Sequence, residues 1–239
     1  MSFYSAIATY YHHIFPFNPQ QLAFVQHHAP CASAPVLIEI GAARGSLTAA
    51  CAKAGYQVTG LELDPLMVQL ARKEHPSLLF HEADMLEMDA FFMPHSADTM
   101  LCFGNTLVHL QDLDQMQGFL NKAFNTLKPE GQLLVQFINY DRIIDQQIKA
   151  LPSLSNEDIS FERRYELISL SAIAFTACLT IKASGQNIEN TQRLYPLRKA
   201  DFEKVAHQAG FETRAYSSFK NEAWSPAGMQ SVFVCTKPA

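Results

Sequence analysis

The chain alternates short apolar runs with longer segments in which apolar residues recur at helical spacing. The apolar runs predict buried strands over residues 36–40, 57–63, 77–82, 99–103 and 132–138. The helical spacing predicts helices over residues 46–54, 65–73 and 112–127, with Pro65 placed in a first turn. Strands that alternate with helices form βαβ units, so this pattern predicts a parallel sheet.

Beyond residue 150 the chain changes to β-rich, partly alternating segments with little helix between them. The segments 161–170, 173–183 and 188–197 predict an antiparallel insertion. A helix over 197–209 is predicted to end at Gly210. Strands over 211–216 and 230–235, joined by a loop over 221–228, are then expected to complete the main sheet.

Composition places the chain among folded proteins without an electrostatic match to nucleic acid. Its 239 residues are 48% hydrophobic and 17% charged, which supports a sizeable core and excludes a disordered chain. With 18 Lys and Arg against 23 Asp and Glu, the net charge is −5, and the sequence contains no basic run. A phosphate backbone is bound through clustered cations, so we expect no nucleic-acid partner.

The placement of cysteine and histidine favours neither disulfides nor a metal centre. The cysteines are scattered without a C-x-x-C pair, as is typical of buried thiols in a reducing compartment. They are Cys31, Cys51, Cys102, Cys178 and Cys235. The pair His12-His13 lacks a third ligand at usable spacing. The N-terminus has no basic stretch before an apolar core, and no apolar run reaches about 20 residues, so we expect a cytoplasmic protein without membrane contact.

Three motifs stand where successive predicted strands end. In Glu39-Ile-Gly41-Ala-Ala-Arg-Gly45, the glycines let a ligand approach the backbone at a helix N-terminus. Glu62 ends the second strand, where a carboxylate accepts hydrogen bonds from both ribose hydroxyls of a nucleoside. Asp84 follows the third strand, where a carboxylate accepts from an adenine amino group. Because these strand ends line one crevice, the motifs together predict a nucleoside site.

The motifs resemble those of class I S-adenosylmethionine-dependent methyltransferases. Glu39-x-Gly41-x-x-x-Gly45, Glu62 and Asp84 fall on the family's motif positions, and segments 102–110 and 127–135 resemble its motifs around strands four and five. Gly104-Asn-Thr-x-x-His109 together with Asn139-Tyr-Asp141 is similar to the glycine/sarcosine N-methyltransferase type. The segment 10–16 resembles a leader motif of that type, with His12 in place of its Asp.

The resemblance implies S-adenosylmethionine as the cofactor and a small-molecule methyl acceptor. The implied cofactor-binding residues are Tyr11, Glu39, Gly41, Ala42, Gly45, Glu62, Leu63, Asp84, Met85, Phe103 and Asn105. The candidate catalytic residues, each as a proton acceptor, are His109, Tyr140 and Asp141. The candidates for a clamp on a substrate carboxylate are Arg142, Arg163 and Arg164, with exposed surface charges as the alternative. No metal is expected.

Most of these residues have a structural interpretation as well. Glu39 suits a hydrogen bond to loop amides, and Asp84 suits a helix N-cap. Met85 and Phe103 suit either an adenine sandwich or the core. Likewise, His109 suits a backbone contact at a helix start, and Tyr11 suits packing of an N-terminal helix.

Two positions depart from the family's first motif. Ala43 stands where the family usually has glycine, and it fits the loop if its φ is negative. Arg44 replaces a small polar residue and is expected either to point to solvent or to cover the methionine carboxylate of the cofactor. The same missing glycine disfavours NAD(P), because a pyrophosphate needs close approach to the backbone.

Together these observations predict an α/β protein with a Rossmann-like, doubly wound sheet of seven strands, the last antiparallel, and an antiparallel β insertion after strand five. The expected divisions are a helical lid (1–34), a cofactor-binding core (35–150), an insertion covering the active site (151–197) and a C-terminal helix with a strand pair (198–239). Methyl transfer to an amine nitrogen is the expected function. A non-catalytic binding module, an NAD(P)-dependent oxidoreductase and a homodimer paired through strand edges remain open.

Overall fold

The computed structural model describes residues 3–29 and 33–239. Cys31 lies outside the described residues, whereas Cys51, Cys102 and Cys235 are buried thiols and Cys178 is a half-buried one. None of the helices in the described ranges is long and apolar enough to cross a membrane.

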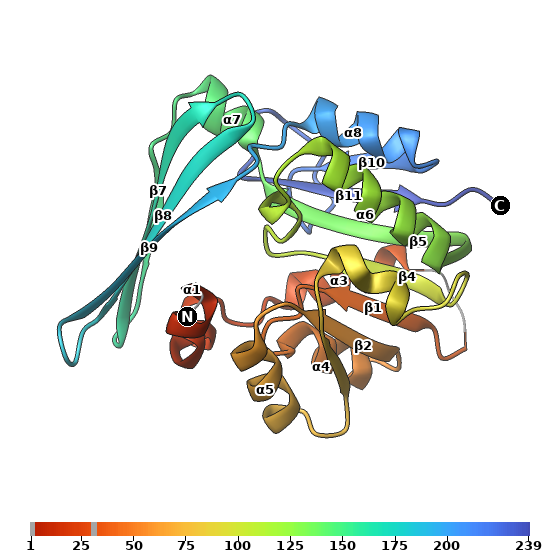
Figure 1. Cartoon of the computed structure of the whole chain (residues 1–239), viewed down its shortest axis with the longest axis horizontal. Helices are drawn as coiled ribbons and strands as arrows, with labels where there is room; N and C mark the ends of the chain where they lie inside the picture. The colour runs from red at the N-terminus through yellow and green to blue at the C-terminus, as the bar shows by residue number, and fades with distance from the viewer. Residues whose placement is uncertain (1–2, 30–32) are drawn as a thin grey trace.

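A seven-stranded sheet forms the centre of the fold (Figure 1). Its strands are β1 (Val36–Ile40), β2 (Gln57–Glu62), β3 (Leu79–Glu82), β4 (Ala97–Cys102), β5 (Leu127–Ile138), β10 (Glu212–Tyr216) and β11 (Gln230–Thr236). They lie in the order β10-β11-β5-β4-β1-β2-β3. Neighbours pair in parallel except β11, which is antiparallel to both β5 and β10. The predicted fold class is therefore confirmed.

Helices cover both faces of this sheet. They are α3 (Pro19–His28), α4 (Ser46–Lys53), α5 (Pro65–Glu74), α6 (Leu113–Thr126) and α8 (Lys199–Gln208). Side chains alternate along β1, so Leu37 packs with α3 and α4 while Ile38 packs with α6 and α8. Asn18, Asp64 and Asp112 cap the N-termini of α3, α5 and α6 by accepting backbone N–H groups.

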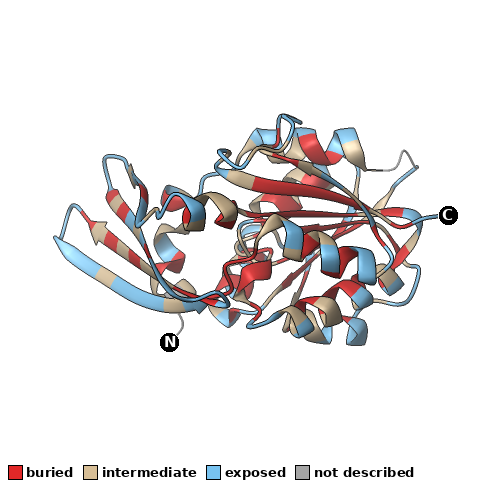
Figure 2. Ribbon diagram, turned by 90° about the horizontal axis from the view of Figure 1, so that it is seen from above, coloured by how far each residue is buried: buried red, intermediate tan, exposed pale blue. Residues whose placement is uncertain are grey.

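The insertion forms a second, four-stranded antiparallel sheet beside the core (Figure 1). Its strands are β6 (Ala150–Ser155), β7 (Ile159–Ser169), β8 (Ala172–Ile181) and β9 (Gln186–Leu194), and the short helix α7 (Tyr140–Asp145) precedes them. Alternate residues of β7, including Phe161 and Tyr165, are buried, whereas much of β9 is exposed (Figure 2). One face of this sheet therefore faces protein and the other faces solvent.

The N-terminal segment lies between the insertion and the core (Figure 1). It comprises α1 (Phe3–Ile7), a 3-10 turn (Ala8–Tyr10) and α2 (Tyr11–Ile14). Ile7 and Ile14 form a small apolar cluster with Ile159 and Phe161 of β7. This cluster attaches the N-terminal segment to the insertion sheet.

Three local features differ from the sequence expectation. β6 and α7 were not predicted, because each has only six residues, too few to show a hydrophobic period. The segment Pro129-Glu-Gly131, which lies between the predicted helix 112–127 and the predicted strand 132–138, is a bulge inside β5, where Glu130 has a φ of 62° and the register against β4 shifts.

Candidate functional site

Two adjoining cavities open at the carboxyl ends of β1, β2 and β4. The first has a volume of about 570 Å³, and the second has a volume of about 420 Å³. Both volumes lie in the range of small-molecule sites. The residues that line both cavities are Tyr4, Tyr11, Gly41, Ala43, Phe103 and Gly104. We call them the first cavity and the second cavity.

Gly41 makes the turn at the end of β1 that separates the two cavities. Its φ is 73°, and a Cβ at this position would lie 2.5 Å from Oγ1 of Thr106. Its N–H donates to the carbonyl oxygen of Leu61 at 2.8 Å. Only glycine therefore fits here, and the backbone is left open to a ligand on the cavity side.

Ala43 was expected to fit the loop only with a negative φ, but its φ is 47°. The residue therefore occupies the left-handed region, where an L side chain costs free energy. Gly45 was predicted to bind the cofactor, and its position in the structure differs from that expectation. Its φ is 78° and a Cβ would meet the ring of Phe80 at 2.5 Å, so Gly45 serves packing and lines neither cavity.

The carboxylate of Glu62 lies in the first cavity and ties two loops together. One oxygen accepts the N–H of Ala43 at 2.8 Å, and the other accepts the N–H of Asp64 at 2.9 Å. Burial raises the pKa of Glu62, and these two hydrogen bonds oppose the rise. Each carboxylate oxygen keeps further acceptor capacity toward the cavity.

Asp84 acts as a helix N-cap, one of the two interpretations that the sequence left open, and its contact with an adenine amino group stays a prediction. It lines the first cavity, and its Oδ1 accepts the N–H of Leu86 at 2.8 Å as the cap of the 3-10 turn Met85–Ala90. Oδ2 takes no part in this cap. Met85, Phe103 and the exposed Leu63 supply apolar surface to the same cavity.

Glu39 lies in the second cavity, one residue before the end of β1. Its side chain is buried and accepts a hydrogen bond from the hydroxyl of Thr48 on α4. Burial raises the pKa of Glu39 to about 8, while the hydrogen bond with Thr48 opposes the rise. Ala42 and Asn105 line the same cavity, and Asn105 fixes the end of β5 by accepting the N–H of Ile138 at 3.0 Å.

His109 lies at the wall of the first cavity, at the end of a 3-10 turn (Leu107–His109). Its Nε2 is 3.0 Å from the hydroxyl of Tyr4 on α1. Burial lowers the pKa of His109 to about 4, so the ring is neutral at neutral pH. A neutral imidazole accepts a hydrogen bond, but with this pKa it holds a proton weakly.

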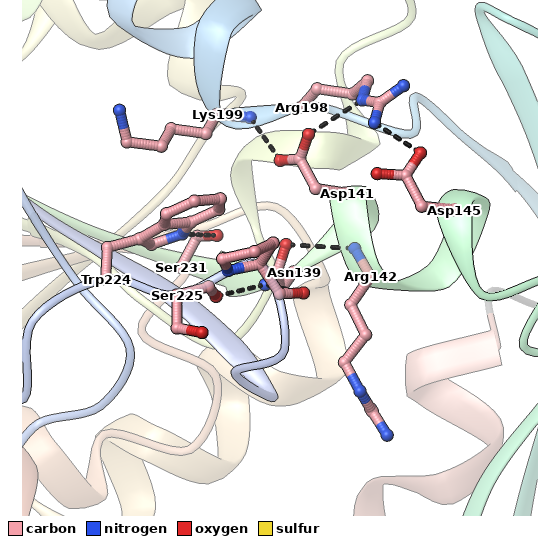
Figure 3. A network of polar contacts seen from close by, with 10 residues as sticks. Asn139, Asp141, Arg142, Asp145, Arg198, Lys199, Trp224, Ser225 and Ser231 are labelled. Carbon is pink, nitrogen blue, oxygen red and sulfur yellow. Dashed lines mark hydrogen bonds and ion pairs between the residues drawn. The ribbon is translucent and has the colours of Figure 1, made fainter.

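Tyr140 and Asp141 do not line either cavity. Tyr140 is fully buried, and its hydroxyl accepts a hydrogen bond from Nδ2 of Asn105 at 3.3 Å. Asp141 faces away, toward α8, where it accepts from Nε of Arg198 and from the N–H of Lys199, both at 2.8 Å (Figure 3). The structure therefore assigns Asp141 to the anchoring of α8 rather than to proton transfer.

Asn139, in the same motif as Asp141, also has a structural role. Its Oδ1 accepts the N–H of Arg142 and so caps α7, and its Nδ2 donates to the carbonyl oxygen of Ser225 (Figure 3). The same Nδ2 lies 3.0 Å from the carbonyl oxygen of Gly228 in this loop. The same loop is fixed by Trp224, whose Nε1 donates to Oγ of Ser231 at 3.0 Å (Figure 3). The segment 139–141 thus holds the C-terminal strands to the core.

Arg44 does not point to solvent but lines the second cavity, and its contact with the methionine carboxylate of the cofactor stays a prediction. Its Nη1 donates to the carbonyl oxygen of Ala8 at 2.9 Å, and its Nη2 forms an ion pair with Glu74 of α5. Nε2 of His12 lies 3.0 Å from the same carboxylate. Together with the bond from Ser5 to Asp64, these contacts attach the N-terminal segment over the cavities.

Several lining residues were not found from the sequence. In the first cavity these include Tyr4, Thr106, Gln192 and Arg193, and in the second they include Phe219, Met229 and Gln230. Most come from elements far along the chain, and among them only Thr106 falls within a quoted motif, Gly104-Asn-Thr-x-x-His109. Of the three candidate arginines, only Arg163 lines a cavity. Within residues 3–29 and 33–239, no group of His, Cys, Asp and Glu is arranged to hold a metal ion.

Comparison with known proteins agrees with this geometry. Residues 37–131 match the family model described as a methyltransferase domain. The demethylmenaquinone methyltransferase of Tropheryma whipplei (strain Twist) is 30% identical over 106 residues, which cover 44% of this chain and 43% of that protein. The glycine/sarcosine N-methyltransferase of Aphanothece halophytica is 24% identical over 117 residues, 48% of this chain and 42% of that protein. The chain thus spans less than half of the length of these relatives.

The fold extends over the whole described chain. An S-adenosylmethionine-dependent methyltransferase from Clostridium acetobutylicum superposes with a TM-score of 0.81, at 11% identity, covering 100% of both chains. At this identity the likeness shows the fold, whereas the sequence match defines the domain. Residues 37–131 are therefore similar to a methyltransferase domain, and the chain has the fold of this S-adenosylmethionine-dependent methyltransferase.

Proposed function

We propose that the chain transfers a methyl group from S-adenosylmethionine to a small molecule whose nucleophile is an amine nitrogen. The observation that carries the proposal is the convergence of Glu62 and Asp84 on one cavity beside the turn at Gly41. Two carboxylates with remaining acceptor capacity suit ribose hydroxyls and an adenine amino group. When bound, S-adenosylmethionine supplies a methyl group already activated by a positively charged sulfur.

The residues present fit this cofactor. Gly41 leaves the backbone open where a Cβ would collide with Thr106, and the absent phosphate removes the need for the third glycine. Glu62 and Asp84 would hold the nucleoside, with Met85 and Phe103 against its base. Glu39 at the second cavity suits an ammonium group, because an adjacent positive charge stabilises the ionised carboxylate.

The chain's main catalytic contribution would be positioning and exclusion of water. The N-terminal segment and β7 close over the cavities through the Ile7 and Ile14 cluster and the contact of Arg44 with Ala8. Aligning two reactants in this way supplies about 7–11 kcal/mol of barrier reduction in favourable cases. The shared wall between the two cavities supports this arrangement and disfavours a role limited to cofactor binding.

Tyr4 and His109 are the polar groups that we place beside the reacting nitrogen. His109 is neutral because burial lowers its pKa to about 4, so its Nε2 or the hydroxyl of Tyr4 accepts a hydrogen bond from the nucleophile. Burial of the acceptor also lowers the pKa of an amine. The amine would therefore react in its neutral form, oriented by Tyr4.

Turnover of the cofactor tests the proposal directly. Purified protein is incubated with S-adenosylmethionine and a panel of amines, alcohols and thiols, and formation of S-adenosylhomocysteine is measured. We expect activity with amines. Activity confined to alcohols or thiols contradicts the nitrogen preference, and product formation with none of the panel contradicts a small-molecule acceptor of these classes.

A further inference from the structure

Two adjacent histidines of the N-terminal segment each face a carboxylate of a different part of the protein. Nε2 of His12 lies 3.0 Å from Oε2 of Glu74 on α5, a helix of the core. Nδ1 of His13 lies 2.9 Å from Oδ2 of Asp158, in the turn between β6 and β7 of the insertion. The two histidines therefore join the N-terminal segment to the core on one side and to the insertion on the other.

The segment that these histidines hold covers both cavities. Tyr4 and Tyr11 belong to it, and each of them lines the first cavity and the second cavity. Residues 16–18, which form neither helix nor strand, connect the segment to α3. Movement about this connection would open both cavities and leave the seven-stranded sheet intact, because none of its strands belongs to the segment.

The groups that face His12 favour its charged form at one carboxylate. Arg44 forms an ion pair with the same Glu74. Burial raises the pKa of Glu74, but the hydrogen bonds from Arg44 and His12 outweigh this effect and hold the pKa below its ordinary value. Burial lowers the pKa of the neighbouring His75, which is therefore charged less often than an ordinary histidine, and burial raises the pKa of Tyr11, which stays neutral.

The groups that face His13 belong to the insertion and to its own helix. Nδ2 of Asn156 donates to the carbonyl oxygen of His13 at 3.1 Å, and the ring of Tyr10 lies at a centroid distance of 6.4 Å. The ammonium of Lys182, in the turn after β8, donates to the carbonyl oxygen of Asn156. The carboxylate of Asp158 is the anion that a charged His13 meets in this turn.

Protonation strengthens both histidine contacts in the same direction. Histidine ordinarily gains its positive charge between about pH 8 and about pH 5. A neutral ring donates an ordinary hydrogen bond to a carboxylate, whereas a charged ring donates a charge-assisted one, which is about twice as strong. Because the partner is a carboxylate on the core side and on the insertion side, a fall in pH tightens the segment at both ends of this bridge.

Other contacts hold the segment independently of these histidines. Nη1 of Arg44 donates to the carbonyl oxygen of Ala8 at 2.9 Å. Burial lowers the pKa of His109 to about 4, so the contact of His109 with Tyr4 does not change its charge above that value. The two histidines therefore adjust how often the segment opens, on top of a closed state that other contacts maintain.

We propose that His12 and His13 make the closure of the two cavities sensitive to pH. Below about pH 6 the charged rings hold the N-terminal segment to Glu74 and Asp158, and above about pH 8 the neutral rings let it open more often. The sign follows from the partners, since the stabilisation that a histidine gains by taking up a proton beside a carboxylate is lost as the pH rises. The proposal concerns a movement of the chain itself and does not depend on the identity of the methyl acceptor.

Hydrogen–deuterium exchange of residues 3–14 measures this opening without any ligand. Exchange is followed by mass spectrometry at about pH 6 and at about pH 8.5, and each rate is divided by the rate of an unstructured peptide at the same pH. The ratio reports how often the segment opens. We expect opening to be about fivefold more frequent at the higher pH, the combined effect of two exposed ion pairs.

Variants assign the pH dependence to the two histidines. His12→Gln and His13→Gln should each keep only about a twofold dependence, and the double variant should show none. His12→Lys keeps a positive charge at both pH values, so at the higher pH its segment should open less often than that of His12→Gln. His27→Gln removes an exposed histidine from α3 that has no carboxylate within ion-pair distance among the described residues, and it should behave as the original chain does.

The outcomes keep this proposal separate from the proposed function. Equal opening of the original chain at the two pH values overturns it. So does a pH dependence that persists in the double variant, because it would belong to another group, such as Glu39, whose pKa burial raises to about 8. If the double variant does not fold, the comparison of the original chain with His12→Lys decides. No cofactor enters these measurements, so a failure to bind S-adenosylhomocysteine would count against the proposed function alone.

Discussion

The hydroxyl of Tyr4 lies 3.0 Å from Nε2 of His109, with the two rings edge to face at a centroid distance of 5.7 Å. These residues are 105 positions apart, and they meet where the N-terminal segment covers the loop after β4. Both line the first cavity, and Tyr4 also lines the second. The contact therefore joins the covering segment to the proposed reaction centre.

Removing this contact should affect the rate more than cofactor binding. For Tyr4→Phe we expect kcat to fall by about tenfold, the worth of one hydrogen bond in a buried site, while the affinity for S-adenosylhomocysteine changes little. His109→Gln should give a loss of similar size. Because the two side chains act as a unit, the double variant should lose less than the sum of the two effects.

The pH profile provides the control for this pair. Since the pKa of His109 is lowered to about 4, its neutral form is present above that value, and activity that depends on it falls only as the pH drops through about 4. A break near the ordinary histidine value that disappears in His109→Gln would contradict this assignment. Steady-state kinetics over a range of pH values provide the measurement.

Arg44 should control how firmly the N-terminal segment closes. Arg44→Gln loses the ion pair with Glu74 and weakens the bond to the carbonyl oxygen of Ala8. We expect S-adenosylhomocysteine to dissociate about tenfold faster, as measured by stopped-flow. Lys53→Gln removes an exposed charge from α4, the helix that follows Arg44, and should leave the rate unchanged. An unaltered dissociation rate in Arg44→Gln would show that the contacts of Arg44 with Glu74 and Ala8 do not retain the ligand.

Ala43 offers a stabilising substitution. With a φ of 47°, Ala43 pays the cost of the left-handed region, which glycine does not. Glycine loses more entropy on folding, so Ala43→Gly should raise the free energy of unfolding by up to about 1 kcal/mol. In contrast, Ala42→Gly at the adjacent, buried position should lower it. Chemical denaturation measures the free energy of unfolding of both variants. A lower value for Ala43→Gly would contradict the backbone strain assigned to Ala43.

Asp141 should matter for stability and not for catalysis. Asp141→Asn weakens the contacts with Arg198 and with the N–H of Lys199, which together hold the start of α8. We expect a loss of about 1 kcal/mol in the free energy of unfolding and an unchanged kcat for the folded protein. Asp145→Asn breaks only an exposed ion pair with Arg198 and should cost less. A lower kcat at unchanged stability would instead indicate that Asp141 acts in catalysis.

The fold was predictable where the information is local. Apolar runs such as 36–40 and 99–103 are buried on both faces of the sheet, so composition alone marks them as central strands. Glu62 and Asp84 were predicted as lining residues for the same reason, because a polar residue at or just after the end of such a run lies at the carboxyl end of a strand. Gly41 belongs with them, since its positive φ requires glycine.

The remainder of the site depends on how distant segments pack. Tyr4 belongs to a five-residue helix with no distinctive pattern, and only tertiary contacts bring it to His109. Arg163 was one of three similar arginines, and the strand register decides which of them faces the cavity. Asp141 shows the converse case: it belongs to the motif Asn139-Tyr-Asp141, yet the start of α7 turns its carboxylate toward α8.

The central claim is that a nucleoside binds at the carboxyl ends of β1–β3, held by Glu62. Calorimetric titration with S-adenosylhomocysteine tests it, using the original chain, Glu62→Gln, and Glu82→Gln as a control at the exposed end of β3. The account predicts saturable binding to the original chain and to Glu82→Gln, and at least about tenfold weaker binding to Glu62→Gln, since an amide cannot accept with both of its terminal atoms. Absence of binding at millimolar ligand, or equal affinity in all three proteins, would contradict it.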